Sequence, residues 1–247
     1  SMITMMFNPE MGDSLKMMAD SMPDLFAAFG MADVGQTLLE FVSGYLYGML
    51  YVAFPGVFII ILSNRLVSRY VDNGSMAYLL AVPQKRWKIM LTQCVFMLTC
   101  LVVMVVYVTC LILAFSEALF PGEMETGAFL RINVGLLGIL VFFGGTCFCA
   151  SCCSNETKTS SAVSTTVVVY SILVQMISQV GDKFEKVKYA TPITLFDIDG
   201  LAAGDGKAWI MCGILYLAGI LLMGIGIIRF SKRDLPLDRK STRLNSS

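Results

Sequence analysis

Five long apolar runs dominate this chain and limit what it can fold into. The runs are Gly44 to Leu62, Ile89 to Phe115, Ile132 to Ala150, Ala162 to Val180, and Ala208 to Ile228. About 20 apolar residues in a helix cross a hydrocarbon core about 30 Å thick. Lipid offers no partner for backbone N–H and C=O groups, so such segments must be helical. We therefore predict an all-α membrane protein with five transmembrane helices.

Composition supports a membrane protein. Hydrophobic residues make up 56% of the chain and charged residues 15%, and the mean hydropathy is +0.73. A soluble domain is about 45–50% apolar and about 25% charged. We divide the chain into an external interfacial segment (residues 1–43), a transmembrane domain (44–237) and a polar tail (238–247).

The charged residues between the runs predict the orientation of the helices. Three alternate loops (63–88, 151–161 and 229–237) hold nine basic and three acidic residues in total. The other three (1–43, 116–131 and 181–207) hold six basic and fourteen acidic residues. Cytoplasmic loops carry an excess of Lys and Arg. We therefore expect a multi-pass protein of the plasma membrane, with residues 1–43 outside and the C-terminus in the cytoplasm.

We expect both ends of the chain to differ from those of a complete protein. Residues 1–30 have no signal-peptide pattern, and the chain starts with Ser1 on the expected outer side. We therefore expect that a first helix precedes it, giving six in all. The segments Ser14 to Met22 and Pro23 to Phe29 have the apolar spacing of short interfacial helices. Residues Asp238 to Ser247 resemble a translated sequencing adapter, and we treat them as non-native.

Missing residues argue against several classes of function. The chain has no His, which argues against zinc proteases and His-dependent acyltransferases. None of the five runs contains an ionisable Asp, Glu, Lys or Arg, although proton-coupled carriers usually need one. The segment Gly200 to Ala208 resembles a phosphate loop, but Leu201 replaces its first Gly and Ala208 its Ser or Thr. We expect no catalytic residue, metal or cofactor in this chain, and hence no enzyme.

Small residues in the runs predict close helix packing. Gly44 and Gly48 form a GxxxG pair, and Pro55 with Gly56 predicts a kink, because Pro removes one backbone hydrogen bond. Gly213, Gly219, Gly224 and Gly226 would allow close approach in the last run. The cluster Cys147 to Cys153 (CFCASCC) points around one helix end, so we interpret its thiols as small packing residues. Palmitoylation or metal sensing remains the alternative.

The loop from Arg65 to Lys88 holds five basic residues and one acidic residue. Gly74 can end the helix of the first run, Ser75 can N-cap a short helix, and Pro83 would break it. Met76, Leu79 and Leu80 would share one apolar face of that helix. An apolar helix face can insert into a groove on a soluble partner. The alternative is a re-entry turn anchored by basic residues.

Three motifs in this order resemble those of type 2 ABC transporter permeases. The segment Gly74 to Ile89 (GSMAYLLAVPQKRWKI) is similar to the coupling-helix signature of that family, with Ala77 where an acidic residue is usual. Ser21 to Met31 resembles the segment after the first helix of the family, and Phe230 to Pro236 its closing motif. The resemblance covers about residues 10 to 237, which makes residues 44–237 a permease domain.

This resemblance implies a membrane subunit of an ABC exporter, of bacterial type, that works by alternating access. Its partners would be a cytoplasmic ABC ATPase, a second permease half (identical or different) and membrane lipid, and not nucleic acid. ATP and magnesium would bind to the ATPase. The resemblance assigns ATPase docking to one set of residues: Gly74, Ser75, Met76, Tyr78, Leu79, Leu80, Pro83, Lys85 and Arg86.

The absence of charge in the spans favours lipids, hydrophobic peptides or drug-like molecules as substrates. Two alternatives stay open from the residues alone. One is a membrane regulatory or immunity protein that works without an ATPase. The other is a membrane enzyme, which would need a polar cavity among the spans.

Overall fold

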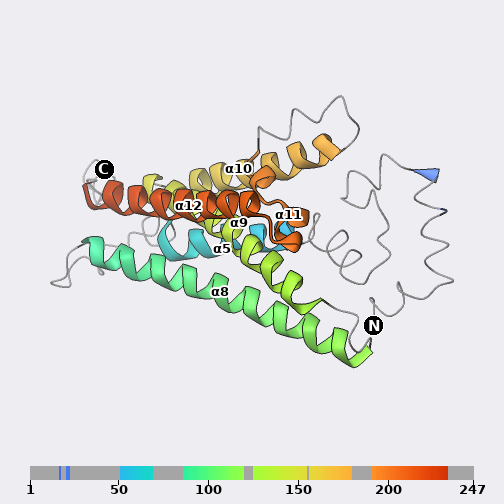
Figure 1. The fold of residues 1–247 in the computed structure, drawn as a ribbon. Helices are drawn as coiled ribbons and strands as arrows, with labels where there is room; N and C mark the ends of the chain where they lie inside the picture. Colours follow the sequence, from blue (N-terminus) through green and yellow to red (C-terminus); the bar gives the residue numbers. More distant parts are fainter. Residues whose placement is uncertain are drawn as a thin grey trace, which may run out of the picture.

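The computed structural model describes most of the chain after residue 50 and three residues before it. The described residues are 17, 21–22, 51–68, 86–119, 125–154, 156–179 and 191–232. Every regular element within these ranges is a helix (Figure 1). The all-α fold is therefore confirmed. In the N-terminal segment, Ser21 Oγ donates a hydrogen bond to the carbonyl oxygen of Met17 at 2.7 Å.

Four helices are long and apolar enough to cross a membrane: α8 (Arg86–Leu119), α9 (Thr126–Cys153), α10 (Thr157–Gln179) and α12 (Gly206–Lys232). They confirm four of the five predicted spans. The first predicted span is described only from residue 51. That part forms α5 (Tyr51–Ser63), followed by a π-helix, η2 (Asn64–Ser68). The helix α5 continues through Pro55.

The helices extend further than the apolar runs. We expected residues 116–131 to form a loop, but Ser116 lies in α8 and Arg131 lies in the second turn of α9. Backbone hydrogen bonding favours continuing a helix through the interfacial region, where polar side chains can reach water. Composition therefore marks the apolar core of a span, but not its ends.

The helix α9 is the central element. In its most apolar 18-residue window 67% is buried, against 28% in the corresponding windows of α8, α10 and α12. It contacts α5, α8, α10 and α12, and its contact with α12 is the most extensive between any two described elements. A helix that is apolar on all sides is expected to be buried. The lipid-facing surface is therefore left to the other helices.

Helices α9 and α12 meet along a line of small residues that we call the α9–α12 seam. The residues form three pairs, spaced seven apart on each helix: Gly138 with Cys212, Gly145 with Gly219, and Cys152 with Gly226. From one pair to the next the residue number increases on both helices, so α9 and α12 run parallel. A seven-residue repeat keeps the same faces in contact along a left-handed supercoil.

The middle of the seam leaves no room for side chains. A Cβ on Gly219 would lie 2.7 Å from the carbonyl oxygen of Val141, and one on Gly145 would overlap the carbonyl oxygen of Gly219. Close backbone approach of this kind drives helix association in membranes, where burial of apolar surface does not. By contrast, within the described part of the chain a Cβ on Gly213 or Gly224 would have no neighbour within 4 Å.

A short helical unit packs on the end of α9 where α9 starts. It consists of a 3-10 helix, η4 (Pro192–Leu195), and α11 (Ile198–Ala203). The Asp197 carboxylate accepts from the Gly200 amide at 3.0 Å, and Gly204 ends α11 with a φ of +79°. A Cβ on Gly135 of α9 would overlap the side chain of Leu201. The sequence pattern had placed this unit in a loop.

Arg131 fixes this unit to α9. Its Nε donates to the carbonyl oxygen of Leu201 at 3.1 Å, and its Nη2 donates to that of Ala202. These carbonyls lie at the C-terminal end of α11, where the helix dipole places partial negative charge and a cation is stabilising. The side chain of Arg131 therefore has a structural role at this end of the bundle.

We predict that Gly219→Ala lowers thermal stability, while Gly224→Ala does not. The added methyl group of Gly219→Ala would push α12 away from Val141, at a cost of about 1–3 kcal/mol. Gly224→Ala adds the same atoms in the same helix where nothing lies within 4 Å. Thermal unfolding in detergent checks this prediction, and equal melting temperatures for the two variants would contradict the seam.

Candidate functional site at the basic end of the bundle

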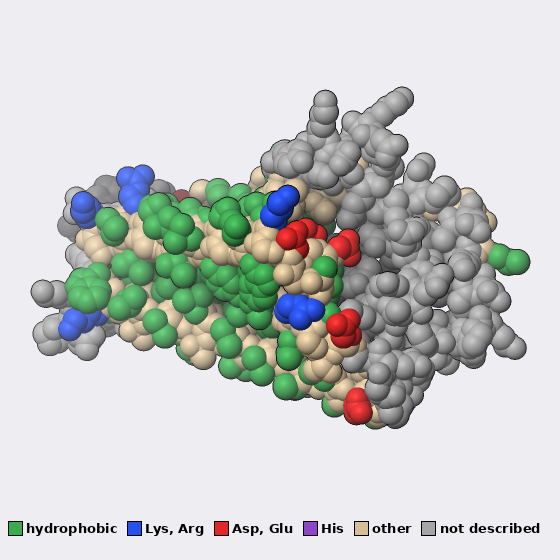
Figure 2. Space-filling model, viewed as in Figure 1, with side chains coloured by type: hydrophobic (Ala, Val, Ile, Leu, Met, Phe, Trp, Pro, Cys, Tyr) green, Lys and Arg blue, Asp and Glu red, His purple; other side chains and the backbone are tan. Residues whose placement is uncertain are grey.

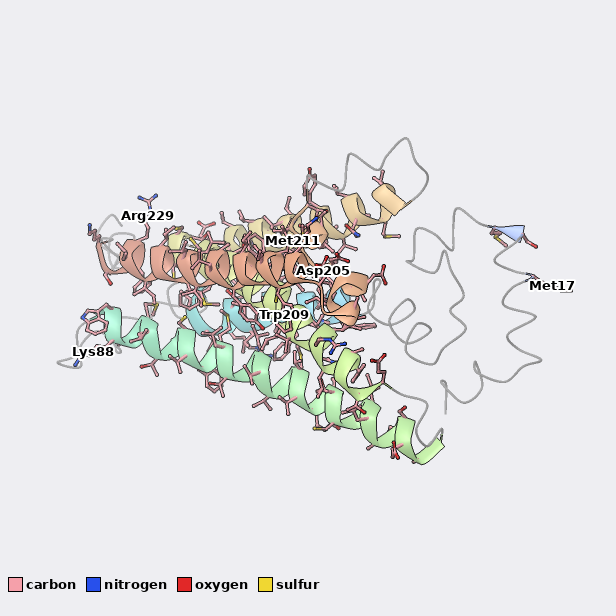
Figure 3. All side chains as sticks on the ribbon, viewed as in Figure 1. Met17, Lys88, Asp205, Trp209, Met211 and Arg229 are labelled. Carbon is pink, nitrogen blue, oxygen red and sulfur yellow. The ribbon has the colours of Figure 1, made fainter. Side chains whose placement is uncertain are left out.

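The described charges are distributed unevenly between the two ends of the bundle (Figure 2). The end at which α9 and α12 start, which we call the acidic end, carries two described cations, Arg131 and Lys207, and five described carboxylates: Glu117, Glu125, Asp197, Asp199 and Asp205. The opposite end, which we call the basic end, carries one described carboxylate, Glu156, and five described cations: Arg65, Lys88, Lys158, Arg229 and Lys232. Figure 3 shows Lys88 and Arg229 at one end and Asp205 at the other.

A chain of hydrogen bonds between side chains joins three segments at the basic end. Ser63 of α5 contacts Ser151 of α9 with an Oγ–Oγ distance of 2.8 Å. Ser151 is also 2.8 Å from Ser160 Oγ of α10. Ser160 donates to Asn64 Oδ1 at 2.9 Å, and Asn64 Nδ2 donates to Ser161 Oγ at 2.7 Å. We call these five residues the Ser–Asn network.

The Ser–Asn network can contribute to stability because most of its side chains are buried. Ser63, Ser151 and Ser160 have no exposed surface, and Asn64 is 8% exposed. A buried polar group without a partner costs free energy, so these groups stabilise the fold only while all of them are paired. The network therefore holds the end of α5 against the turn between α9 and α10.

A buried apolar cluster lies beside the network. It joins η2, α8, α9 and α12 through eight residues: Val67, Met90, Cys94, Met97, Phe148, Cys152, Met223 and Phe230. Val67 comes from η2, just before residues 69–85, and Met90 from the first turns of α8, just after them. Both flanks of the 69–85 segment are thus packed against α9 and α12.

The two elements that flank residues 69–85, η2 and α8, are both packed into the bundle. The π-helix η2 ends at Ser68 and α8 begins at Arg86. Short π-helical turns are frequent at functional sites. Close-packed interiors transmit displacement because they contain few voids. A force on residues 69–85 would therefore act on α9 and α12 through η2 and α8.

Most of the predicted docking residues lie outside the described residues. Gly74, Ser75, Met76, Tyr78, Leu79, Leu80, Pro83 and Lys85 fall in the gap 69–85. Arg86 starts α8, although its side chain is not described. Docking by these residues stays a prediction, and the structure adds the position of both flanks at the basic end.

The predicted packing residues of the first span are only partly described. Gly44 and Gly48 lie outside the described residues. Pro55 and Gly56 are buried in α5, and a Cβ on Gly56 would lie 2.9 Å from Val168 Cγ1 of α10. The kink at Pro55 stays a prediction.

The cysteines at the end of α9 differ in their surroundings. Cys147 and Cys152 are buried, Cys149 is partly exposed and Cys153 is exposed. Within the described ranges, no group of three or more His, Cys, Asp or Glu side chains is placed to hold a metal ion. Cys152 instead contributes to the α9–α12 seam, opposite Gly226.

Sequence reasoning missed the Ser–Asn network. Ser63 and Asn64 follow directly on the first apolar run, and Ser160 and Ser161 precede the fourth, so each looked like an ordinary loop residue. Their pairing depends on which helices are neighbours, which the sequence alone does not show. The available signal was the position of small polar residues at three run ends on the same predicted side.

The chain matches a known protein family. Residues 2–235 match the family model described as ABC-2 family transporter protein. No curated protein matches the chain, and no solved structure matches it.

We predict that Asn64→Ala destabilises the basic end. The change leaves Ser161 without its donor and removes the acceptor of Ser160, which costs about 1–2 kcal/mol. Ser68→Ala is the matched control in the same π-helix, because its buried hydroxyl has no hydrogen-bond partner among the described residues. Thermal unfolding in detergent should show a lower melting temperature for Asn64→Ala and no decrease for Ser68→Ala. The opposite order would show that the network does not stabilise this end.

Proposed function

The chain belongs to the ABC-2 transporter family, and from this premise we propose that it is the membrane half of an ATP-driven exporter. Its role is that of a permease, a transporter membrane subunit and not itself an enzyme. The match over residues 2–235 is the observation that carries this conclusion. ATP and magnesium would bind to a separate ABC ATPase subunit.

We propose that the basic end faces the cytoplasm and that the C-terminus lies there. The support is the excess of described cations at this end of the bundle and of described carboxylates at the other. Cytoplasmic loops are enriched in Lys and Arg because the orientation of membrane helices follows this bias. The unit formed by η4 and α11 would then lie on the outer side.

The proposed ATPase contact is a short coupling helix from Ser75 to Val82. Met76, Tyr78, Leu79 and Leu80 would enter a groove on the ATPase, with Pro83 ending the helix and Lys85 and Arg86 beside it. Support comes from the packed flanks of this segment, since Val67 and Met90 belong to one buried cluster. A docking element on such flanks can pass its displacement to the spans.

The proposed mechanism is alternating access by two permease halves. A ligand shifts a two-state equilibrium only when it binds one state better than the other. Here ATP would do so by closing the two ATPase subunits, which would move the coupling helices. Backbone atoms of α9 and α12 are in contact along the α9–α12 seam. This leaves no space for one helix to shift gradually along the other. We therefore propose that α9 and α12 move together.

Substrate selection falls to the faces of the spans. The five apolar runs contain no Asp, Glu, Lys or Arg, and among the buried polar side chains Thr109 donates to Asn133 Oδ1 at 2.9 Å. An apolar path of this kind favours lipids, hydrophobic peptides or drug-like molecules, because desolvating an ion costs several kcal/mol.

We predict that Leu79→Asp and Leu80→Asp abolish recovery of the ATPase. The chain would be coexpressed with the ABC ATPase of its transporter and purified through a tag on the chain. A carboxylate at either position would be buried without a partner in the ATPase groove, which should reduce recovery at least roughly tenfold.

The matched control is Ala77→Asp, which adds the same charge where related permeases usually carry an acidic residue. Wild type and Ala77→Asp should recover the ATPase in equal yield. Normal recovery with both Leu variants would refute docking through this helix. Failure of wild type to recover any ATPase would favour a regulatory protein that works without one.

A further inference from the structure

A cavity of about 360 Å³ lies at the basic end, between the last turns of α9 and α12. Its lining residues are Cys152 and Cys153 of α9 with Arg229 and Lys232 of α12. Arg229 and Lys232 are three positions apart, so they lie on neighbouring turns of the same helix face. The described lining of the cavity therefore presents two cations and no carboxylate.

These two cations differ from Arg131 at the acidic end. Arg131 donates hydrogen bonds to carbonyl oxygens at the end of α11. Neither Arg229 nor Lys232 forms an ion pair with a carboxylate in the described part of the chain, and both are exposed. Their location in the last turn of α12 also complements its terminal carbonyls. The Arg229 guanidinium has five N–H donors and the Lys232 ammonium has three. Together these are more donors than the last carbonyl groups of α12 can accept.

The length of α12 places these cations at the depth of lipid headgroups. The helix contains 27 residues, which at about 1.5 Å per residue makes it about 40 Å long. A bilayer measures about 30 Å across its hydrocarbon core and about 40–45 Å with its headgroup regions. When Gly206 lies in one headgroup region, Arg229 and Lys232 therefore lie in the other.

An exposed apolar stripe leads from the membrane core to the cavity. Leu221, Ile225 and Ile228 are 58%, 50% and 57% exposed. With Lys232 they follow the spacing i, i+4, i+7 and i+11, which defines one side of a helix. An acyl chain can lie along these three residues while its headgroup reaches Lys232 and Arg229. A free anion in water would gain nothing from the stripe.

We propose that the cavity binds the phosphate group of an anionic membrane lipid in the leaflet at the basic end. The Arg229 guanidinium would donate to two phosphate oxygens, and the Lys232 ammonium would pair with the same group as a point charge. Because Cys152 lines the cavity and also packs against Gly226, a bound lipid would stabilise the end of the α9–α12 seam. This proposal does not rest on the proposed transport function.

The test uses the purified full chain in a non-ionic detergent. Its melting temperature is measured while phosphatidylglycerol, phosphatidylcholine or inorganic phosphate is added. We expect phosphatidylglycerol to raise the melting temperature in a saturable manner, and phosphatidylcholine and inorganic phosphate to have little effect. An equal effect of inorganic phosphate would overturn the assignment to a lipid, and an equal effect of phosphatidylcholine would overturn recognition of the phosphate charge.

Two double variants distinguish a built site from diffuse charge. Arg229→Gln with Lys232→Gln should raise the lipid concentration needed for half the effect at least roughly tenfold, since each cation near an anionic surface contributes to binding. Lys88→Gln with Lys158→Gln removes the same charge from the same end, outside the cavity, and should leave that concentration unchanged. Equal losses in both pairs would overturn the proposal.

A third variant covers the case in which the first pair does not fold. Arg229→Lys with Lys232→Arg keeps both charges, and we expect it to retain the response to phosphatidylglycerol. Loss of the response in this well-folded variant would overturn binding by these two cations. Circular dichroism and gel filtration identify variants that have unfolded.

Discussion

The close contact of α9 with α12 is the interaction on which the rest of the structure depends. Backbone atoms touch where Gly219 meets Val141 and Gly145 meets Gly219, so the two helices have one register and no alternative nearby. Membrane helices gain little from burying apolar surface, and close packing of small residues takes its place. The seam fixes α12 on one side of α9 and leaves other faces of α9 for the remaining helices.

Three further contacts are arranged along α9 by small or polar residues. At the acidic end Gly135 admits Leu201 of α11, at mid-height Gly144 faces Leu101 of α8, and at the basic end Ser151 joins the Ser–Asn network. A displacement of the segment between η2 and α8 would reach the unit formed by η4 and α11 through this one helix. This arrangement suits the proposed mechanism, in which a permease responds to the state of an ATPase.

The sequence predicted what depends on composition and failed where tertiary neighbours decide. The spans were predictable, because apolar runs of this length can exist only as membrane helices. The ends of the spans were not predictable, because a helix can continue into the interface. Arg131, for example, was expected in a loop but lies in α9. The sequence pattern could not show that Gly219 of α12 lies in close contact with α9 while Gly213 does not. The two differ only in whether α9 lies opposite. The coupling segment remains known by its sequence resemblance and its two packed flanks.

The most direct test of the central role of the seam is cross-linking with a native cysteine. A Cβ at position 138 would lie 3.4 Å from Cys212 Sγ, a distance compatible with a disulfide. After treatment with iodine or copper phenanthroline, peptide mass mapping of Gly138→Cys should show a bond to Cys212. The control Gly224→Cys, with no neighbour within 4 Å, should form no bond to α9. Absence of the bond in Gly138→Cys, or a bond from residue 224 to α9, would contradict the parallel register.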